Sequence, residues 1–422
     1  MNPIKSLTTN NIARNIFSLG FATLLSAALS FIIGIMTRNL LGPQQYGYYL
    51  SISLIFTFIP LMQLGTLNAM NREIPFYKAR NQFDKVKEIK DLTLSFLLTV
   101  PTVSVILMFV ISIILYFTNI ENEYKIGFFY SSIISLLIIF SLYVEMYYKS
   151  EQNFRFASRL ILIKSMSQSI LTLFLVYLMG YNGLYLGMIL GFLIEIFIGK
   201  TSFTNANFKV DGKKYKELIQ LGFPIMLVGM VWSILIASDR LMITAMMSPE
   251  DLGNYGIGML VFNSMMLLPQ VIGQVYYPKI VEYISSQNYN ELYRQYWKVN
   301  FFLAVGVAGI VLTLYFLFPW FVKVFLPEYT GGIKTGQILI LGVYPLTLVG
   351  FSANYFNATK NQKTYIMIQI VTIFTNIFLS LIFLHFNFKI TSIAWGTACS
   401  YFIYFLLMNY YFLKDIRGTL NK

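Results

Sequence analysis

The residues best suited to chemistry in this sequence are a few charged side chains beside long apolar stretches. Arg38 and Arg240 each close such a stretch, Asp239 directly precedes Arg240, and Arg72 closes another stretch. A charge in the centre of a bilayer costs at least about 2.5–3.5 kcal/mol, so charges kept there indicate a function. Because the planar guanidinium group suits phosphate, the three arginines are candidate contacts to an anion. The competing interpretation is that these long side chains reach the headgroups from helix ends.

A second set of candidates consists of acids and amides within the apolar stretches. Glu145 and Glu195 lie late in two of them and are candidates to exchange a proton or Na⁺. Asn68 and Gln270 are candidate substrate contacts, although amides within a membrane more often form hydrogen bonds between helices.

Several kinds of chemistry are excluded by what the sequence does not contain. It has no glycine-rich phosphate loop, no dinucleotide fingerprint and no zinc-protease motif. The single Cys399 cannot form an intramolecular disulfide, and the single His385 cannot build a multi-histidine metal site. We therefore expect no catalytic residues, no metal, no cofactor and no enzymatic activity.

The composition places these residues in a membrane. Of the 422 residues, 57% are hydrophobic and only 12% are charged, whereas soluble domains are about 25% charged. So few charges cannot cover a surface that faces water. The chain is therefore not a soluble enzyme, a disordered chain or a secreted disulfide scaffold, and an all-α polytopic membrane protein is expected.

Stretches of roughly 20 apolar residues predict membrane-spanning helices, because a helix satisfies its own backbone in lipid. The first is expected to remain as a helix rather than to be removed as a signal peptide. The twelve predicted spans are 16–37, 46–70, 92–117, 126–148, 160–179, 183–199, 218–238, 254–277, 299–322, 335–357, 364–386 and 390–412.

The distribution of basic residues predicts the orientation of these spans. Of the 31 lysine and arginine residues, 25 lie on one side of the predicted membrane and six on the other. Basic residues accumulate on the cytoplasmic side, so both termini are expected in the cytoplasm. The net charge of +13 is then explained by topology and by attraction to anionic lipid, and no nucleic-acid partner is expected.

The two halves of the chain carry similar patterns. Tyr46-Gly47 precedes Pro60 by the same distance that Tyr255-Gly256 precedes Pro269. This repeat predicts two six-helix lobes in parallel orientation, residues 1–207 and 218–422, joined by an amphipathic cytoplasmic linker at 208–217. Residues 76–90 and 278–297 alternate apolar and charged residues, and this pattern predicts further amphipathic helices on the membrane surface.

Taken in order, these motifs resemble those of Wzx-type polysaccharide transporters, which belong to the multidrug/oligosaccharidyl-lipid/polysaccharide (MOP) flippase superfamily. The resemblance covers nearly the whole chain and depends on the order and spacing of short motifs. They are Arg38 to Gly47, Leu64-Gly65, Arg72-Glu73, Ser238 to Leu241, Leu252 to Gly256, Pro269 to Lys279, Asn376-Ile377 and Ala394 to Thr397. Trp395 departs from the small residues usual at its position.

The resemblance implies a V-shaped pair of lobes around a central cavity that opens alternately to the two sides. It implies an undecaprenyl-diphosphate-linked oligosaccharide as substrate, flipped to the outer leaflet of a bacterial plasma (inner) membrane for lipopolysaccharide or capsule biosynthesis. An ion gradient of H⁺ or Na⁺, or the membrane potential, would drive this step. Membrane lipid and the glycan polymerase and glycosyltransferases of the same pathway are the implied partners.

Three other functions are compatible with a chain of many spans. An ion-coupled multidrug exporter of the same superfamily is the nearest alternative. A membrane glycan polymerase or ligase would be expected to carry a long outer loop with catalytic residues, and the outer links here are short. A passive scaffold gives no reason for charges that match between the two halves.

Overall fold

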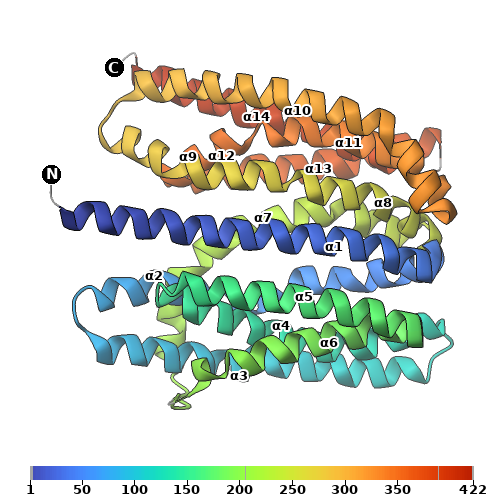
Figure 1. Cartoon of the computed structure of the whole chain (residues 1–422), viewed down its shortest axis with the longest axis horizontal. Helices are drawn as coiled ribbons and strands as arrows, with labels where there is room; N and C mark the ends of the chain where they lie inside the picture. Colours follow the sequence, from blue (N-terminus) through green and yellow to red (C-terminus); the bar gives the residue numbers. More distant parts are fainter. Residues whose placement is uncertain (1–2, 205, 388, 421–422) are drawn as a thin grey trace. The chain divides into compact units, whose positions relative to one another are not determined.

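The fold is entirely helical in the part of the chain that the computed structural model describes (Figure 1). The structure describes residues 3–204, 206–387 and 389–420; in this part, the side chains of 3–24, 26, 27, 270–272, 274 and 275 are not described. The described residues form fourteen α-helices and three short 3₁₀ helices, with no strand among them. The predicted all-α polytopic fold is confirmed.

Eight described helices are long and apolar enough to cross a membrane, and two further spans arise if each of two bent helix pairs is counted as one. Two predicted spans lie outside this count. Residues 16–37 form the first part of α1, and 254–277 are divided between α8 and α9 at Met266. The helices α3 and α10 expose many large apolar side chains, as expected for surfaces in contact with lipid. On α3 these are Val103, Ile106, Leu107, Val110, Ile111 and Ile114.

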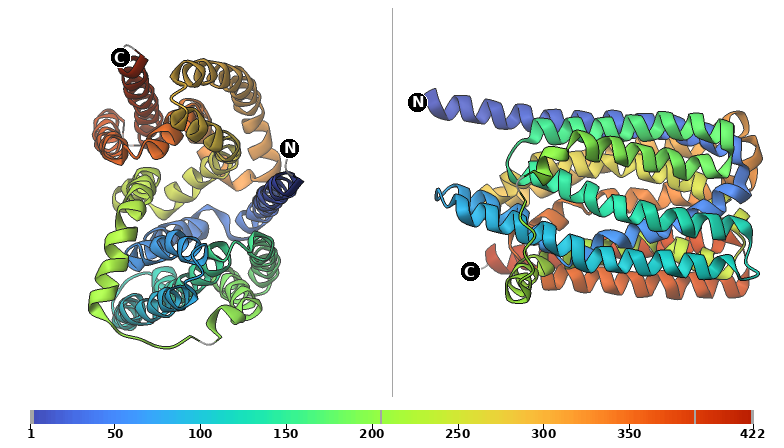
Figure 2. Two further views of the ribbon diagram at one scale, coloured as in Figure 1. Left: turned by 90° about the vertical axis from the view of Figure 1, so that its left-hand side faces the viewer. Right: turned by 90° about the horizontal axis from the view of Figure 1, so that it is seen from below.

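The chain divides into two compact units, which are described separately. Unit 1 comprises residues 1–41 and 52–230. In it, α3 packs on α4, and α4, α5 and α6 pack on one another (Figures 1 and 2). Its elements are α1 (Pro3–Phe58, in part), η1 (Ile59–Gln63), α2 (Thr66–Lys78), α3 (Phe83–Tyr116), α4 (Asn122–Ser150), α5 (Phe154–Met179), α6 (Tyr181–Ile198), η2 (Lys200–Phe203) and the start of α7 (Gly212–Met246).

The second span of unit 1 is broken rather than continuous. The chain bends by 47° between Gln63 and Thr66, where Leu64 and Gly65 adopt left-handed backbone conformations with φ of 49° and 90°. Gln63 holds the break together: its Oε1 accepts a hydrogen bond from the backbone N–H of Leu67 at 2.8 Å. Its Nε2 donates to the Asn68 side chain, also at 2.8 Å.

Unit 2 comprises residues 42–51 and 231–422. In it, α14 packs on α11 and α13, and α11 also packs on α8 and α10. Besides the remaining parts of α1 and α7, its elements are α8 (Pro249–Met265), α9 (Leu267–Ser285), α10 (Tyr289–Phe325), η3 (Pro327–Gly332), α11 (Ile333–Thr347), α12 (Gly350–Ala358), α13 (Gln362–Phe386) and α14 (Ile390–Leu420).

Two helices are shared between the units, and close backbone contacts explain why. The helix α1 has a kink at Gly42 (φ 72°), and its residues 42–51 belong to unit 2. A methyl group on Gly47 would lie 1.7 Å from the carbonyl oxygen of Pro249. The start of α7 packs within unit 1, where a methyl group on Gly222 would lie 1.8 Å from the carbonyl oxygen of Gly65. Each glycine therefore allows an approach that no larger residue permits.

One turn at a helix end occurs twice in each unit. In every copy a non-glycine residue adopts a left-handed conformation with φ between 54° and 61°. The next N–H then donates to a carbonyl five residues earlier at 2.9–3.0 Å, which is the hydrogen bond of a Schellman motif. The donor and acceptor pairs are Gln82 and Tyr77, Asn153 and Tyr148, Asn288 and Tyr283, and Asn361 and Phe356.

The surface helices predicted at 76–90 and 278–297 are wrong, since each range contains one of these turns. Residues 76–90 hold the end of α2 and the start of α3, and 278–297 hold the end of α9 and the start of α10. The alternation of charged and apolar residues arose from two helix ends rather than from one helix lying on the membrane. In the expected linker 208–217, helix begins at Gly212.

Candidate functional site

The two repeated arginines have similar local environments in their respective units. Arg38 lies in α1 four residues before the kink and is only 5% exposed. Its Nη1 donates a hydrogen bond to the carbonyl of Gly34 at 2.9 Å. The Arg240 side chain in α7 is 18% exposed, and its Nη2 contacts the carbonyl of Ile236 at 3.4 Å. Each guanidinium therefore bonds back to its own helix, four residues earlier.

Asp239 lies beside Arg240 but is fully enclosed in unit 2. One carboxylate oxygen accepts the backbone N–H of Arg240 at 2.7 Å and lies 4.0 Å from its guanidinium Nε. The other accepts a hydrogen bond from the Tyr255 hydroxyl on α8. Asp239 therefore acts as the local counter-charge of Arg240 and joins α7 to α8.

The remaining predicted substrate contacts differ in their surroundings. Arg72 is the most open of the three arginines, with a side chain 61% exposed and its Nε 3.5 Å from a carboxylate oxygen of Glu73. Asn68 accepts a hydrogen bond from Gln63 and thus helps to hold the break before α2. Gln270 belongs to α9, but its side chain lies outside the described residues.

The two predicted acids, Glu145 and Glu195, are brought together by a lysine. Lys164 on α5 forms an ion pair with Glu145 on α4, and its ammonium group lies 3.3 Å from Glu195 on α6. Glu195 has no exposed surface, while the side chains of Lys164 and Glu145 are mostly buried. We call these three residues the charged triad.

Two further side chains complete the environment of the charged triad. The Ser141 hydroxyl donates to a carboxylate oxygen of Glu195 at 2.5 Å and accepts from the Lys164 ammonium at 3.2 Å. Lys149, nearer the end of α4, pairs with Glu145 at 2.8 Å. The triad alone carries one net negative charge when its members are ionised, so a single bound proton makes it neutral.

Lys164 is not among the predicted site residues; it is one of the basic residues predicted on the cytoplasmic side. The helix α5 begins at Phe154, ten residues earlier, which corresponds to about 15 Å along the helix. The available signal was the apolar run from Leu160 to Ile163, directly before the lysine. A lysine within such a run needs a buried partner, and Glu145 and Glu195 are those partners.

Comparisons with solved structures show the fold to which these residues belong. An inward-facing multidrug resistance MATE family transporter of the MOP superfamily is 14% identical, with a TM-score of 0.79 over 97% of this chain and 99% of that one. The lipid II flippase MurJ in an inward closed conformation is 16% identical, with a TM-score of 0.73 over 95% and 90%. A MOP superfamily transporter from Pyrococcus furiosus is 12% identical, with a TM-score of 0.69 over 96% of both chains.

The sequence comparisons identify the family. No curated protein sequence matches the chain. The family model described as "Polysaccharide biosynthesis protein" matches residues 12–284, well over half of the chain. This match and the fold point to a transporter rather than an enzyme, as the absence of catalytic motifs predicted. The chain therefore belongs to the polysaccharide biosynthesis protein family, and its fold is that of the MOP transporters.

Proposed function

We propose that this protein flips an undecaprenyl-diphosphate-linked oligosaccharide from the cytoplasmic to the outer leaflet of a bacterial plasma membrane by alternating access. The family match supports a role in polysaccharide biosynthesis. Both termini lie in the cytoplasm in this proposal, which follows from the bias of basic residues to one side. Glycosyltransferases would supply the substrate and a polymerase would use the product.

The observation that carries this proposal is the matching placement of Arg38 and Arg240. Arg38 lies four residues before the kink of α1, Arg240 lies six residues before the end of α7, and each bonds back to the carbonyl four residues earlier. A diphosphate group cannot enter hydrocarbon unaided. Guanidinium groups form strong hydrogen bonds with phosphate oxygens, so they suit the head of the lipid while its polyprenyl tail stays in the bilayer. In this proposal Arg72, more exposed than Arg38 and Arg240, makes the first contact.

Coupling to a proton is the part of the proposal that the charged triad supports. Two carboxylates face one buried ammonium group, so protonation of one carboxylate changes the net charge of the site by one unit. The ammonium group of Lys164 lies 3.3 Å from Glu195 and would repel a bound Na⁺. We therefore favour a proton over Na⁺, with Glu195 as the acid that binds it.

The decisive experiment measures export of the lipid-linked repeat unit in cells whose only flippase is this chain. Arg38→Ala and Arg240→Ala are each expected to lower export at least tenfold, with Lys at either position restoring part of it. The control is Arg159→Ala, because Arg159 is an exposed arginine on α5 with no place in the proposal. Export at the wild-type level in all arginine variants, with normal membrane insertion, would remove these residues from the mechanism.

The nearest alternative, a drug exporter, gives a different phenotype. Cells that lack such an exporter become sensitive to cationic dyes while their surface glycan is unchanged. Cells that lack the proposed flippase lose surface glycan and keep their dye resistance. Measuring both properties in one deletion strain separates the two functions.

A further inference from the structure

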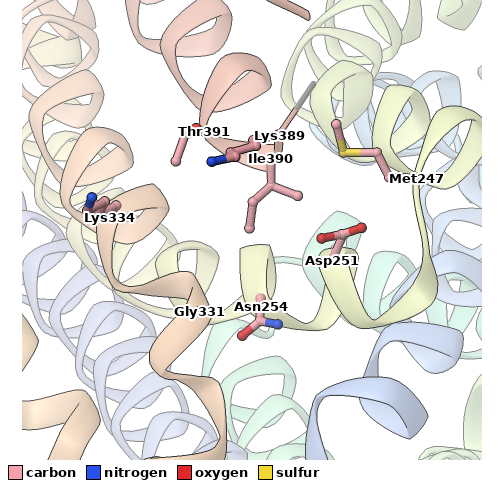
Figure 3. A pocket seen from close by; sticks show the side chains of 8 residues that line it. All are labelled: Met247, Asp251, Asn254, Gly331, Lys334, Lys389, Ile390 and Thr391. Carbon is pink, nitrogen blue, oxygen red and sulfur yellow. The ribbon is translucent and has the colours of Figure 1, made fainter. Parts of the chain in front are cut away.

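Unit 2 contains a hollow of about 320 Å³ that none of the residues discussed above lines. Its walls come from the starts of α8, α11 and α14 (Figure 3). Ligand sites span about 300–1,000 Å³, so this hollow suits a small group such as one sugar ring. It is lined by Met247, Asp251, Asn254, Gly331, Lys334, Lys389, Ile390 and Thr391.

The charges around the hollow favour a negative ligand. Lys334 lies in the first turn of α11, and Lys389 directly precedes α14, where the N–H groups of a helix start attract anions. Asp251 is the acid among the lining residues, and its carboxylate is engaged in capping α8 through the Ser248 hydroxyl at 2.7 Å. The balance at the hollow is therefore positive.

A buried amide on the opposite wall favours a ligand that also carries hydroxyl groups. Asn254 is 9% exposed, and its Nδ2 donates to the carbonyl of Glu250 at 3.1 Å. That bond fixes the amide, so Oδ1 is an acceptor, and this atom has no hydrogen-bond partner among the described residues. A buried acceptor left unsatisfied is costly, and a simple anion offers it no donor.

Gly331 is a neighbour of this acceptor and, like Asn254, lines the hollow. A methyl group at this position would lie 3.4 Å from Asn254 Oδ1, within van der Waals contact. The lysines and Thr391 surround the rest of the hollow (Figure 3).

We infer that this hollow binds an acidic sugar ring, with Lys334 and Lys389 contacting its carboxylate and Asn254 accepting a hydrogen bond from a hydroxyl. The inference deepens the proposed function and rests on it, because the transported oligosaccharide would supply the sugar. It predicts that the oligosaccharide contains an acidic sugar. In the proposed topology, Lys334 and Lys389 are two of the six basic residues on the outer side, where the sugar would bind after crossing.

The test measures binding of D-glucuronate to the purified full-length protein in phosphatidylcholine nanodiscs. Saturation-transfer NMR detects the bound sugar. Glucose, which lacks the charge, and acetate, which lacks the hydroxyl groups, are each expected to bind at least tenfold more weakly. Lys334→Gln and Lys389→Gln should weaken glucuronate binding about tenfold and leave glucose binding unchanged. Lys323→Gln, an exposed lysine of α10 outside the hollow, is the matched control and should change neither.

Asn254→Leu should weaken the binding of glucuronate and of glucose alike, because it removes the acceptor for the sugar hydroxyl while the side-chain volume stays similar. If Asn254→Leu lowers the yield of folded protein, Gly331→Ala tests the same contact between the sugar hydroxyl and Asn254, because it adds a methyl group beside Asn254 Oδ1. Glucuronate binding that survives Lys334→Gln/Lys389→Gln would overturn the inference. So would equal binding of acetate and glucuronate, or loss of glucuronate binding when phosphatidylglycerol is added to the nanodiscs.

These outcomes are distinguishable from failure of the proposed function, because binding is measured without transport. Glucuronate binding together with normal surface glycan in the deletion strain would remove the flippase proposal and keep the sugar site. Loss of surface glycan in the deletion strain, together with no glucuronate binding by the purified protein, would keep the flippase proposal and remove the sugar site.

Discussion

The ammonium group of Lys164 lies 3.3 Å from the carboxylate of Glu195, a side chain with no exposed surface. The pair joins α5 to α6, and the contact of Lys164 with Glu145 extends the link to α4. Burying charges is costly, and a buried ion pair repays that cost only when each partner is present. The charged triad therefore makes the packing of three helices depend on the charge of Glu195.

Lys164→Met is expected to destabilise unit 1 strongly, because it leaves two carboxylates without their shared cation. Loss of one partner of a buried pair costs about 3–5 kcal/mol. Glu195→Gln should cost less, because Ser141 and Lys164 can still hydrogen-bond to the amide. The thermal midpoint of the purified protein in detergent measures both effects.

The double variant Lys164→Met/Glu195→Gln should be more stable than Lys164→Met alone, since the unpaired buried charge on Glu195 is removed. Lys149→Met is the control: the Lys149 side chain is 29% exposed, against 18% for Lys164, and it contacts only Glu145 of the triad, so its loss should cost less. Equal midpoints for Lys164→Met and Lys149→Met would contradict the structural role of the triad.

Gly222→Ala is expected to destabilise the protein, because a methyl group there would overlap the carbonyl oxygen of Gly65. Overpacking of this kind costs about 1–3 kcal/mol. Gly229→Ala is the matched control on the same helix, where a methyl group meets no described atom within 4 Å. Since alanine favours helix over glycine, that variant should be at least as stable as the wild type. A thermal midpoint for Gly222→Ala equal to that of Gly229→Ala would refute the close contact.

Gln152→Gly should stabilise the turn between α4 and α5. Gln152 is exposed and has a φ of 61°, a conformation that costs a side-chain-bearing residue about 1–2 kcal/mol. Glycine removes this strain but adds chain entropy to the unfolded state, so the expected net gain is about 0.5–1 kcal/mol. Gln152→Ala keeps the strain and should leave the midpoint nearly unchanged. A gain from alanine as large as that from glycine would mean that strain is not the cause.

The same turn has a pH-dependent component at Glu151. Burial opposes ionisation of this carboxyl, but hydrogen bonds from Lys78 and Lys90 outweigh burial and hold its pKa below the usual range. A lowered pKa in the folded state stabilises the protein above the pKa of the unfolded chain, near 4.5. That stabilisation is lost as the pH falls further toward the folded pKa.

Wild type and Glu151→Gln should therefore differ in thermal midpoint at pH 7, by an amount that stays constant down to about pH 5. Below that pH the difference should shrink. A difference that grows on acidification would show that the carboxyl is not held by its lysine partners.

The fold class could be predicted from the sequence because lipid leaves few choices for a chain with so few charges. The breaks in the spans were harder to predict. The bend in the span 46–70 occurs at Leu64 and Gly65, where the Gln63 side chain accepts a hydrogen bond from the backbone N–H of Leu67. Such a break depends on one side chain and its tertiary contacts, which no periodicity records.

The candidate site was predicted in part. Glu145 and Glu195 could be found because each is an acid in an apolar run, but their connection through Lys164 depends on how α4, α5 and α6 pack on one another. Asp239 could be found from its place beside Arg240, whereas its bond to Tyr255 links residues on separate helices. Residues within one helix are readable from the sequence, and contacts between helices are not.

The hydrogen bond between Asp239 and Tyr255 offers a last test, by a double-mutant cycle. Hydrogen bonds to charged groups contribute about 1.5–3 kcal/mol, so Tyr255→Phe should lower the stability of unit 2 by that amount. Asp239→Asn keeps an acceptor for the hydroxyl but removes the counter-charge of Arg240, and it should lower stability as well. If the two groups interact as the structure shows, the loss in the double variant is smaller than the sum of the single losses, by 0.5 kcal/mol or more. Strictly additive losses in thermal or denaturant unfolding would mean that the two residues stabilise α7 and α8 independently, and that Asp239 serves Arg240 alone.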